Sequence, residues 1–380
     1  MNERTQDNMT DEMLREQIPP SAEYNAPEKP KTKNKVVKRI GIIAFVIVNA
    51  LVIYFTARDE FTKKNPPKME PFSFTNILFL TLGVLIVAIT LGCETVKFMM
   101  MMKHLGEKVS FRVAFECTAL GRYYDCVTPS GSGGQPFQIW YFHSHGYSTG
   151  AASAMPLSCF CTTQFGFVFL AIMVFIFGGS TIDLPGLRIT AYIGAFTYLI
   201  VPAMIVLCGV APKIAMKIVA SVVKLGAVLH IVKNPNHTTM SALKVLNSYS
   251  QNLKKITKNK RLFIRLMLLS ILYQASISSL PFCAIHTFGG KIGFFEALAL
   301  TVFIQSVVCL VPTPGNAGAA ETSFYMIFSS LGTAGTFWAM LLWRMLCYYS
   351  FILIGVVIYG YTALIKFRNR KREKNLEHQS

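Results

Sequence analysis

The sequence predicts an all-α integral membrane protein with about six transmembrane helices and two re-entrant helical hairpins in an inverted-repeat arrangement. Three observations predict this fold. Hydrophobic residues make up 52% of the 380 residues and charged residues only 15%, whereas soluble proteins carry about 25% charged residues. Apolar runs of about 20 residues, long enough to cross a bilayer, recur along the chain. Two further apolar stretches, 111–144 and 293–332, are interrupted near their middles by helix breakers.

The elements are expected in the following order. A polar segment rich in Pro and Lys, 1–39, is expected to be a disordered cytoplasmic tail. The segment 40–366 is expected to form one polytopic membrane domain, in which 211–261 supplies amphipathic helices at the cytoplasmic surface. A second basic cytoplasmic tail is expected at 367–380. The runs expected to span the membrane are 40–57, 74–100, 150–178, 188–209, 262–286 and 334–366.

The formal net charge of +18 is explained by membrane topology. Most Lys and Arg residues lie in four groups, at 1–39, 97–112, 213–265 and 366–374. If the N-terminus is cytoplasmic, all four groups fall on the cytoplasmic side, as the positive-inside rule requires. We therefore expect cytoplasmic termini and contact with anionic lipid headgroups. Binding to nucleic acid is not expected, because no basic patch is interleaved with stacking aromatics.

The two interrupted stretches share one plan. In the first, the breaker TPSGSGG separates two half-length helices, and in the second PTPGNAG does the same. Both breakers contain Thr-Pro with a Gly five residues after the Thr. One hairpin follows an inward span and the other an outward span, so the units 74–178 and 262–366 are expected to be inverted repeats. Many secondary transporters have this plan and bind their substrate where the broken helices meet.

Ionisable residues within the apolar segments need a partner or a cavity, because each costs about 2.5 to 3.5 kcal/mol in hydrocarbon. The bases expected there are Arg122 and Arg344. Two interpretations stay open for Arg122 with Asp125 and for Arg344 with Glu321: structural ion pairs, or groups that bind a ligand. The remaining acids are expected at segment ends facing headgroups, and they are Glu94, Glu116 and Glu296.

The segments GRYYDCVTPSGSGGQPFQIWYF and VPTPGNAGAAETSF, with Arg344 downstream, resemble the lysylphosphatidylglycerol synthase transmembrane-region family. This family is the flippase half of the bacterial multiple peptide resistance factor, and the resemblance covers about 40–366. In two-domain members a soluble aminoacyltransferase domain adds lysine to phosphatidylglycerol, and the membrane domain moves the product to the outer leaflet. The resemblance implies a flippase of the bacterial cytoplasmic membrane. Its substrate would be lysylphosphatidylglycerol or a related aminoacylated or phosphate-containing lipid, and it would contribute to resistance to cationic antimicrobial peptides.

This leading hypothesis defines a set of expected site residues. The glycines among them either form tight turns or expose backbone N–H groups that bind an anion at a half-helix start. No catalytic residue, cofactor or metal is expected: His143 and His145 lack helical metal-site spacing, and no nucleotide-binding loop is present. The residues expected to contact the lipid are Arg122, Asp125, Thr128, Pro129, Gly133, Gly134, Gln135, Pro312, Pro314, Gly315, Gly318, Glu321 and Arg344.

Two alternatives stay open. Only RNRKREKNLEHQS follows Phe367, so we expect this chain to lack the aminoacyltransferase domain. A phosphatidylglycerol lysyltransferase, or its membrane subunit, would then require a separately encoded lipid-modifying transferase as partner. The other alternative is a carrier for a small soluble anion, or a membrane scaffold. Whether the chain takes part in an enzyme and whether it forms an oligomer are left open.

Overall fold

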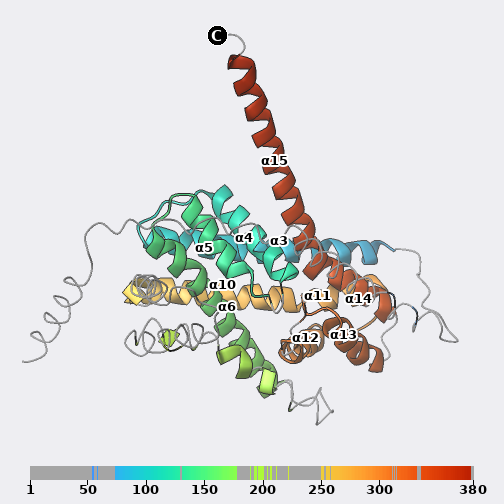
Figure 1. Ribbon diagram of the computed structural model, residues 1–380. Coiled ribbons are helices and arrows are strands. Elements are labelled where there is room, and N and C mark those ends of the chain that lie inside the picture. Colours follow the sequence, from blue (N-terminus) through green and yellow to red (C-terminus); the bar gives the residue numbers. More distant parts are fainter. Residues whose placement is uncertain are drawn as a thin grey trace, which may run out of the picture. The chain divides into compact units, whose positions relative to one another are not determined.

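The computed structural model describes residues 73–128, 131–177, 258–309, 315–331 and 335–377, together with isolated positions elsewhere. All of these residues belong to one compact part of the chain, Val48–Ser380. The described residues form helices and no strand (Figure 1).

The first repeat unit contains a long helix, a broken helix and a second long helix. Ser73 and Ser110 cap the first two helices, each accepting a bond from the backbone N–H three residues later. The helices of this unit are α3 (Phe74–His104), α4 (Phe111–Val127), α5 (Gly134–Ser144) and α6 (Thr149–Phe177).

The second repeat unit has the same order of parts. Its last span contains a π-helical turn, named η1, in its interior. The elements of this unit are α10 (Lys260–Ser278), α11 (Leu280–Thr287), α12 (Phe294–Val308), α13 (Ala319–Ser330), α14 (Thr336–Arg344), η1 (Met345–Tyr349) and α15 (Ser350–Glu377).

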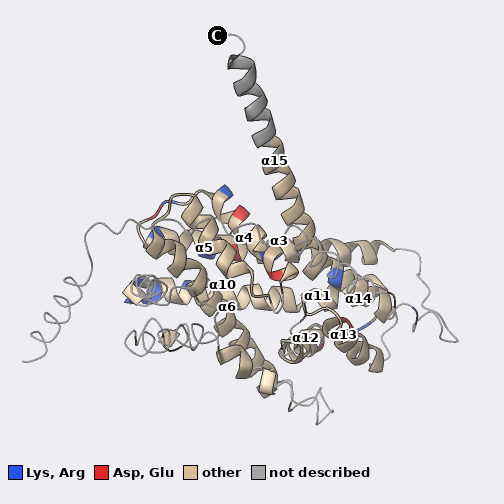
Figure 2. Ribbon diagram, in the orientation of Figure 1, with Lys and Arg blue, Asp and Glu red and all other residues tan. Residues whose placement is uncertain are grey.

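Four helical segments are long and apolar enough to cross a membrane, and they confirm four of the six predicted spans. Figure 2 shows that acids and bases are sparse along these helices. The other two predicted spans, 40–57 and 188–209, fall largely outside the described residues, as do the tail 1–39 and most of 211–261. The four confirmed segments are Phe74–His104, Thr149–Phe177, Lys260–Thr287 and Thr336–Thr362. Helix α15 continues to Glu377, so most of the predicted tail 367–380 is helical.

Both interrupted stretches are pairs of short helices, as predicted: α4 packs on α5, and α12 packs on α13 (Figure 1). The contacts of the two units correspond. In the first unit α3 contacts α4 and α6, and in the second α11 contacts α12 and α14. Across the units, α4 packs on α15 while α6 packs on α12. This matching pattern supports the predicted internal repeat.

The two repeat units contact each other where α6 crosses α10 at close range. A Cβ added at Gly166 would lie 2.9 Å from the backbone carbon of Ser270, so only glycine permits this approach. Large apolar side chains remain exposed along the outer faces of the helices, where a bilayer would cover them. They include Leu85, Ile172, Ile264 and Leu353.

Candidate functional site: a polar cavity between the two broken helices

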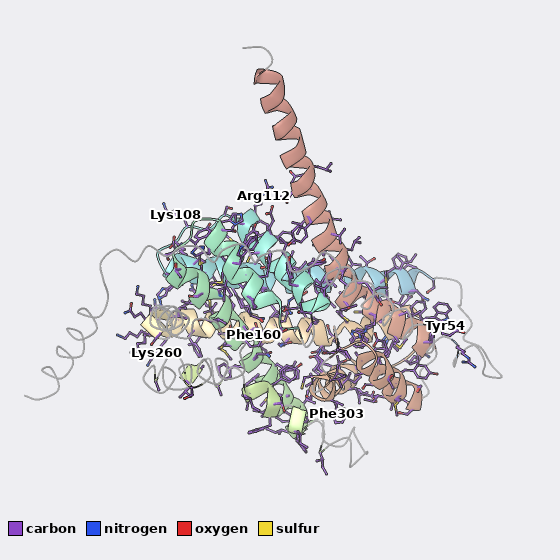
Figure 3. The ribbon with its side chains drawn as sticks, viewed as in Figure 1. Tyr54, Lys108, Arg112, Phe160, Lys260 and Phe303 are labelled. Carbon is purple, nitrogen blue, oxygen red and sulfur yellow. The ribbon has the colours of Figure 1, made fainter. Side chains whose placement is uncertain are left out.

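A cavity of about 330 Å³ lies between the two breaks, and α6, α10 and η1 complete its wall. Phe160 of α6, labelled in Figure 3, contributes part of the apolar wall. The rest of the wall is unusually polar for a site among apolar helices. Its charged and amide side chains are Glu94, Arg122, Asp125, Gln135, Gln138, Gln164, Gln274, Gln305, Asn316 and Arg344.

Arg122 is the centre of the first charged cluster. Its Nε donates a 3.0 Å hydrogen bond to Oε2 of Glu94, and its Nη1 lies 3.7 Å from Oδ2 of Asp125. The guanidinium carbon stands 4.8 Å from the ring centroid of Tyr273, a cation–π distance. The Arg122 side chain nevertheless remains 23% exposed. Two carboxylates therefore hold an arginine that still presents surface to the cavity.

Two sequence-based expectations about charge are wrong. Glu94 does not face headgroups from a segment end: it is buried within α3 and binds Arg122. Lys97 was expected to belong to a cytoplasmic group, yet it lies inside α3 and is fully buried. The physical reason is the length of α3, which continues to His104 and so keeps both residues among packed helices.

The first break is closed by side chains of the arm before it. Oδ1 of Asp125 accepts the N–H of Gly134 at 2.8 Å, and Oγ1 of Thr128 accepts the N–H of Gly133, also at 2.8 Å. A Cβ at Gly134 would lie 2.3 Å from Oδ1 of Asp125, so glycine is needed for this close approach. The protein's own oxygens thus occupy these N–H groups at the start of α5.

The second break is closed by a buried ion pair. Glu321 accepts the N–H of Gly318 at 2.7 Å with Oε2, and accepts Nε of Arg344 at 2.6 Å with Oε1. The other two nitrogens of Arg344 donate to the carbonyl oxygens of Gly315, at 3.3 Å, and Asn316, at 3.5 Å. The side chains of Arg344 and Glu321 are only 6% and 5% exposed. This arginine therefore holds the backbone of the break in place.

Tyr348 of η1 connects the two breaks. Its hydroxyl donates to the carbonyl oxygen of Cys126, near the end of α4, at 3.2 Å. Its ring packs so closely on Gly315 that a Cβ there would lie 2.0 Å from the ring atom Cε2. The Arg344 guanidinium carbon lies 5.1 Å from the centroid of the same ring. π-Helical turns are frequent at functional sites, which fits this position.

The structure places the predicted site residues in three groups. Arg122, Asp125, Gln135, Gly315 and Arg344 line the cavity. A second group supports the breaks behind the wall, and it comprises Thr128, Gly133, Gly134, Gly318 and Glu321. Pro129, Pro312 and Pro314 lie outside the described residues.

Sequence reasoning missed several residues of the wall. The signal that could have found them is a polar side chain within an apolar span, because such residues usually face the interior or a cavity. The missed residues are Glu94, Gln138, Gln164, Gln274, Gln305 and Tyr348.

Long apolar helices that enclose a charged cavity define the chain as a multi-pass α-helical membrane protein. Residues 41–355 match the family described as the lysylphosphatidylglycerol synthase TM region, and the chain belongs to this family. It is also similar to a protein named UPF0104 membrane protein from Archaeoglobus fulgidus. The two are 22% identical over 348 residues, which cover 88% of this chain and 99% of the relative.

Proposed function

We propose that this protein is a lipid flippase that moves lysylphosphatidylglycerol, or a related aminoacylated or phosphate-containing lipid, between the leaflets of the membrane. The observation that carries the proposal is the polar, charged cavity at the two breaks, enclosed by helices with apolar outer faces. A volume of about 330 Å³ is at the lower end of small-ligand sites, which run from about 300 to 1,000 Å³. Such a cavity suits the headgroup of a lipid whose acyl chains remain in the bilayer.

Arg122 is the residue best placed to bind the lipid phosphate. Nε of Arg122 donates a hydrogen bond to Glu94. Nη1 comes no closer than 3.7 Å to Asp125, which is beyond hydrogen-bond distance. The N–H groups at the end of the guanidinium can therefore form a forked contact with a phosphate. In Arg344 all three nitrogens already donate to protein oxygens.

The remaining wall suits the rest of an aminoacylated headgroup. Asp125 and Glu94 supply carboxylate oxygens for a cationic amine, and the glutamine amides supply donors and acceptors for ester and hydroxyl groups. The same cavity thus offers a cation for the phosphate and anions for the amine.

Reconstitution into liposomes tests the proposal. The purified chain should accelerate the movement of acyl-labelled lysylphosphatidylglycerol across phosphatidylcholine vesicles, compared with vesicles that lack protein. Inorganic phosphate loaded in the same vesicles should not leak faster. Phosphate leakage without lipid movement would favour a carrier for small anions. Transfer of lysine from charged tRNA to phosphatidylglycerol by the purified chain would favour the lysyltransferase alternative.

We place the protein in the bacterial cytoplasmic membrane with both termini in the cytoplasm, where it would contribute to resistance to cationic peptides. The clustering of Lys and Arg supports this orientation. Lys255 is exposed and offers a labelling position. A Lys255→Cys variant should react with an impermeant thiol reagent only after the cells are permeabilised, and labelling in intact cells would contradict the orientation.

A further inference from the structure

Lys97 is a buried basic residue that the proposed transport has not yet used. It lies in α3 with 0% of its surface exposed. Its Nζ donates to Oγ1 of Thr163 on α6 at 2.5 Å and to Oγ of Ser270 on α10 at 3.2 Å. Within the described part of the chain no carboxylate forms an ion pair with it. Two neutral hydroxyls therefore hold a lysine inside a membrane-spanning helix, where ionisable residues usually have a function.

The position of Lys97 places its charge directly behind the wall of the cavity. Thr163 and Tyr273 line the cavity on one side and contact Lys97 on the other: Nζ lies 5.5 Å from the centroid of the Tyr273 ring. Lys97 is also three residues after Glu94, so the two side chains share a face of α3. Charges act strongly over such distances in a poorly solvated interior, because water does not screen them.

The four charged side chains of the wall, Arg122, Arg344, Glu94 and Asp125, balance when all are ionised. Behind the wall lie Glu321, with one negative charge, and Lys97, whose ammonium form carries one positive charge. Without Lys97 the other five groups carry one net negative charge, which would repel a phosphodiester. The ammonium form of Lys97 brings the total of the six groups to zero.

We propose that Lys97 is a specificity-determining residue that sets the net charge of the headgroup the cavity accepts. The inference rests on the proposed lipid transport. With Lys97 present, the cavity admits a phospholipid whose only headgroup charge is its phosphate. Without Lys97, the cavity favours headgroups with a net positive charge. Thr163 and Tyr273 separate Lys97 from the lipid. Lys97 therefore acts through its electrostatic field and not as a ligand.

A purely structural role is the competing explanation, because Lys97 also joins α3 to α6 and α10. The two roles differ in what they change. Loss of a structural anchor lowers stability and slows all lipids alike. Loss of a selectivity charge changes the ratio between lipids of opposite net charge.

The test compares the transport rates of an anionic and a cationic lipid in phosphatidylcholine vesicles. The anionic lipid is acyl-labelled phosphatidylglycerol and the cationic lipid is acyl-labelled lysylphosphatidylglycerol. Lys97→Met should lower the anionic-to-cationic transport ratio on the order of tenfold. Lys97→Arg should leave the ratio unchanged, because the charge remains. Ser270→Ala is the matched control, since it removes a hydroxyl partner outside the wall without changing the charge.

A second variant keeps the inference testable if Lys97→Met does not fold. Lys97→Gln also removes the positive charge but retains a side chain that can hydrogen-bond to Thr163 and Ser270, and it should lower the same ratio by a similar factor. Equal slowing of both lipids in each folded variant would overturn the inference and leave the proposed function standing. Absence of lipid movement by the wild-type protein would overturn the proposed function itself.

Discussion

At both breaks a carboxylate accepts a backbone N–H near the start of the second arm and also pairs with an arginine. At the first break Asp125 accepts from Gly134 and lies beside Arg122. At the second break Glu321 accepts from Gly318 and binds Arg344. A carboxylate, a glycine N–H and an arginine thus close each of the two breaks, although the three groups occur in a different order along the chain.

The two arginines differ in how much of their binding capacity the protein uses. Arg344 donates from all three nitrogens and its side chain is 6% exposed, whereas the Arg122 side chain is 23% exposed and its Nη1 makes only a long contact with Asp125. We therefore propose that the second break is a fixed support and that the first break is where the lipid headgroup binds. Variants at each break test this division.

Arg344→Met should strongly destabilise the protein. It leaves the buried carboxylate of Glu321 without its cation and frees two carbonyl oxygens at the second break. Removing one partner of a buried ion pair typically costs about 3 to 5 kcal/mol. Thermal unfolding of the detergent-solubilised protein measures the effect. Wild-type stability of Arg344→Met would show that this pair does not support the second break.

Gly315→Ala should be the next most harmful change. Gly315 has a φ of +57°, and an added Cβ would lie 2.0 Å from the Tyr348 ring. Gly131 is the matched control: its φ is +61°, but the nearest atom to an added Cβ is 3.8 Å away. Gly131→Ala should cost about 1 kcal/mol for the left-handed backbone alone. Gly315→Ala should cost about 3 kcal/mol because overpacking is added. Equal unfolding temperatures of the two variants would contradict the close packing of Tyr348 on the second break.

Arg122→Lys should preserve folding and lower lipid transport about tenfold, because a lysine cannot form the forked contact with a phosphate. Arg112→Lys is the matched control: Arg112 is also on α4 and also pairs with a glutamate, Glu116, but it lies outside the cavity wall. Its transport rate should equal that of the wild type. Equal rates for the two variants would remove Arg122 from the binding site.

Neutral variants of the first cluster separate pairing from ligand binding. Because Arg122 binds Glu94 as well as Asp125, changing only Arg122 and Asp125 leaves a buried carboxylate unpaired. The suitable variant is Arg122→Gln with Asp125→Asn and Glu94→Gln. It should fold better than Arg122→Gln alone and remain inactive in transport. An active triple variant would show that these charges serve structure only.

Tyr348→Phe should have the smallest effect. The ring would still pack on Gly315, and the bond to the carbonyl oxygen of Cys126 would be lost, at a cost of about 1 kcal/mol. Tyr124→Phe is a control, since its hydroxyl contacts that of Tyr359 at an exposed position. A lower unfolding temperature for Tyr348→Phe than for Tyr124→Phe would confirm that Tyr348 joins the breaks. The reverse order would contradict it.

The amino-acid sequence alone was enough to predict the class of protein, the positions of four spans and the two helix breaks. These features depend on composition and on neighbours along the chain. Apolar runs reveal spans whatever they pack against. A cluster of Pro and Gly within a few residues favours a break in a helix, whereas a single proline such as Pro156 is accommodated within α6. The spacing of Arg122 and Asp125 likewise places both on one helix face, and the structure confirms that they lie close together.

Which charges share the cavity depends on how the helices pack, and the sequence did not predict it. Arg122 has its hydrogen-bonded carboxylate on another helix, at Glu94, and the partners of Lys97 lie on α6 and α10. Tyr348 reaches Cys126 across more than half the chain. The physical reason is that the rotation and crossing of packed helices determine which polar residues meet. The rotation and crossing angle of each helix depend on contacts such as that of Gly166 with Ser270, which no local pattern in the sequence encodes.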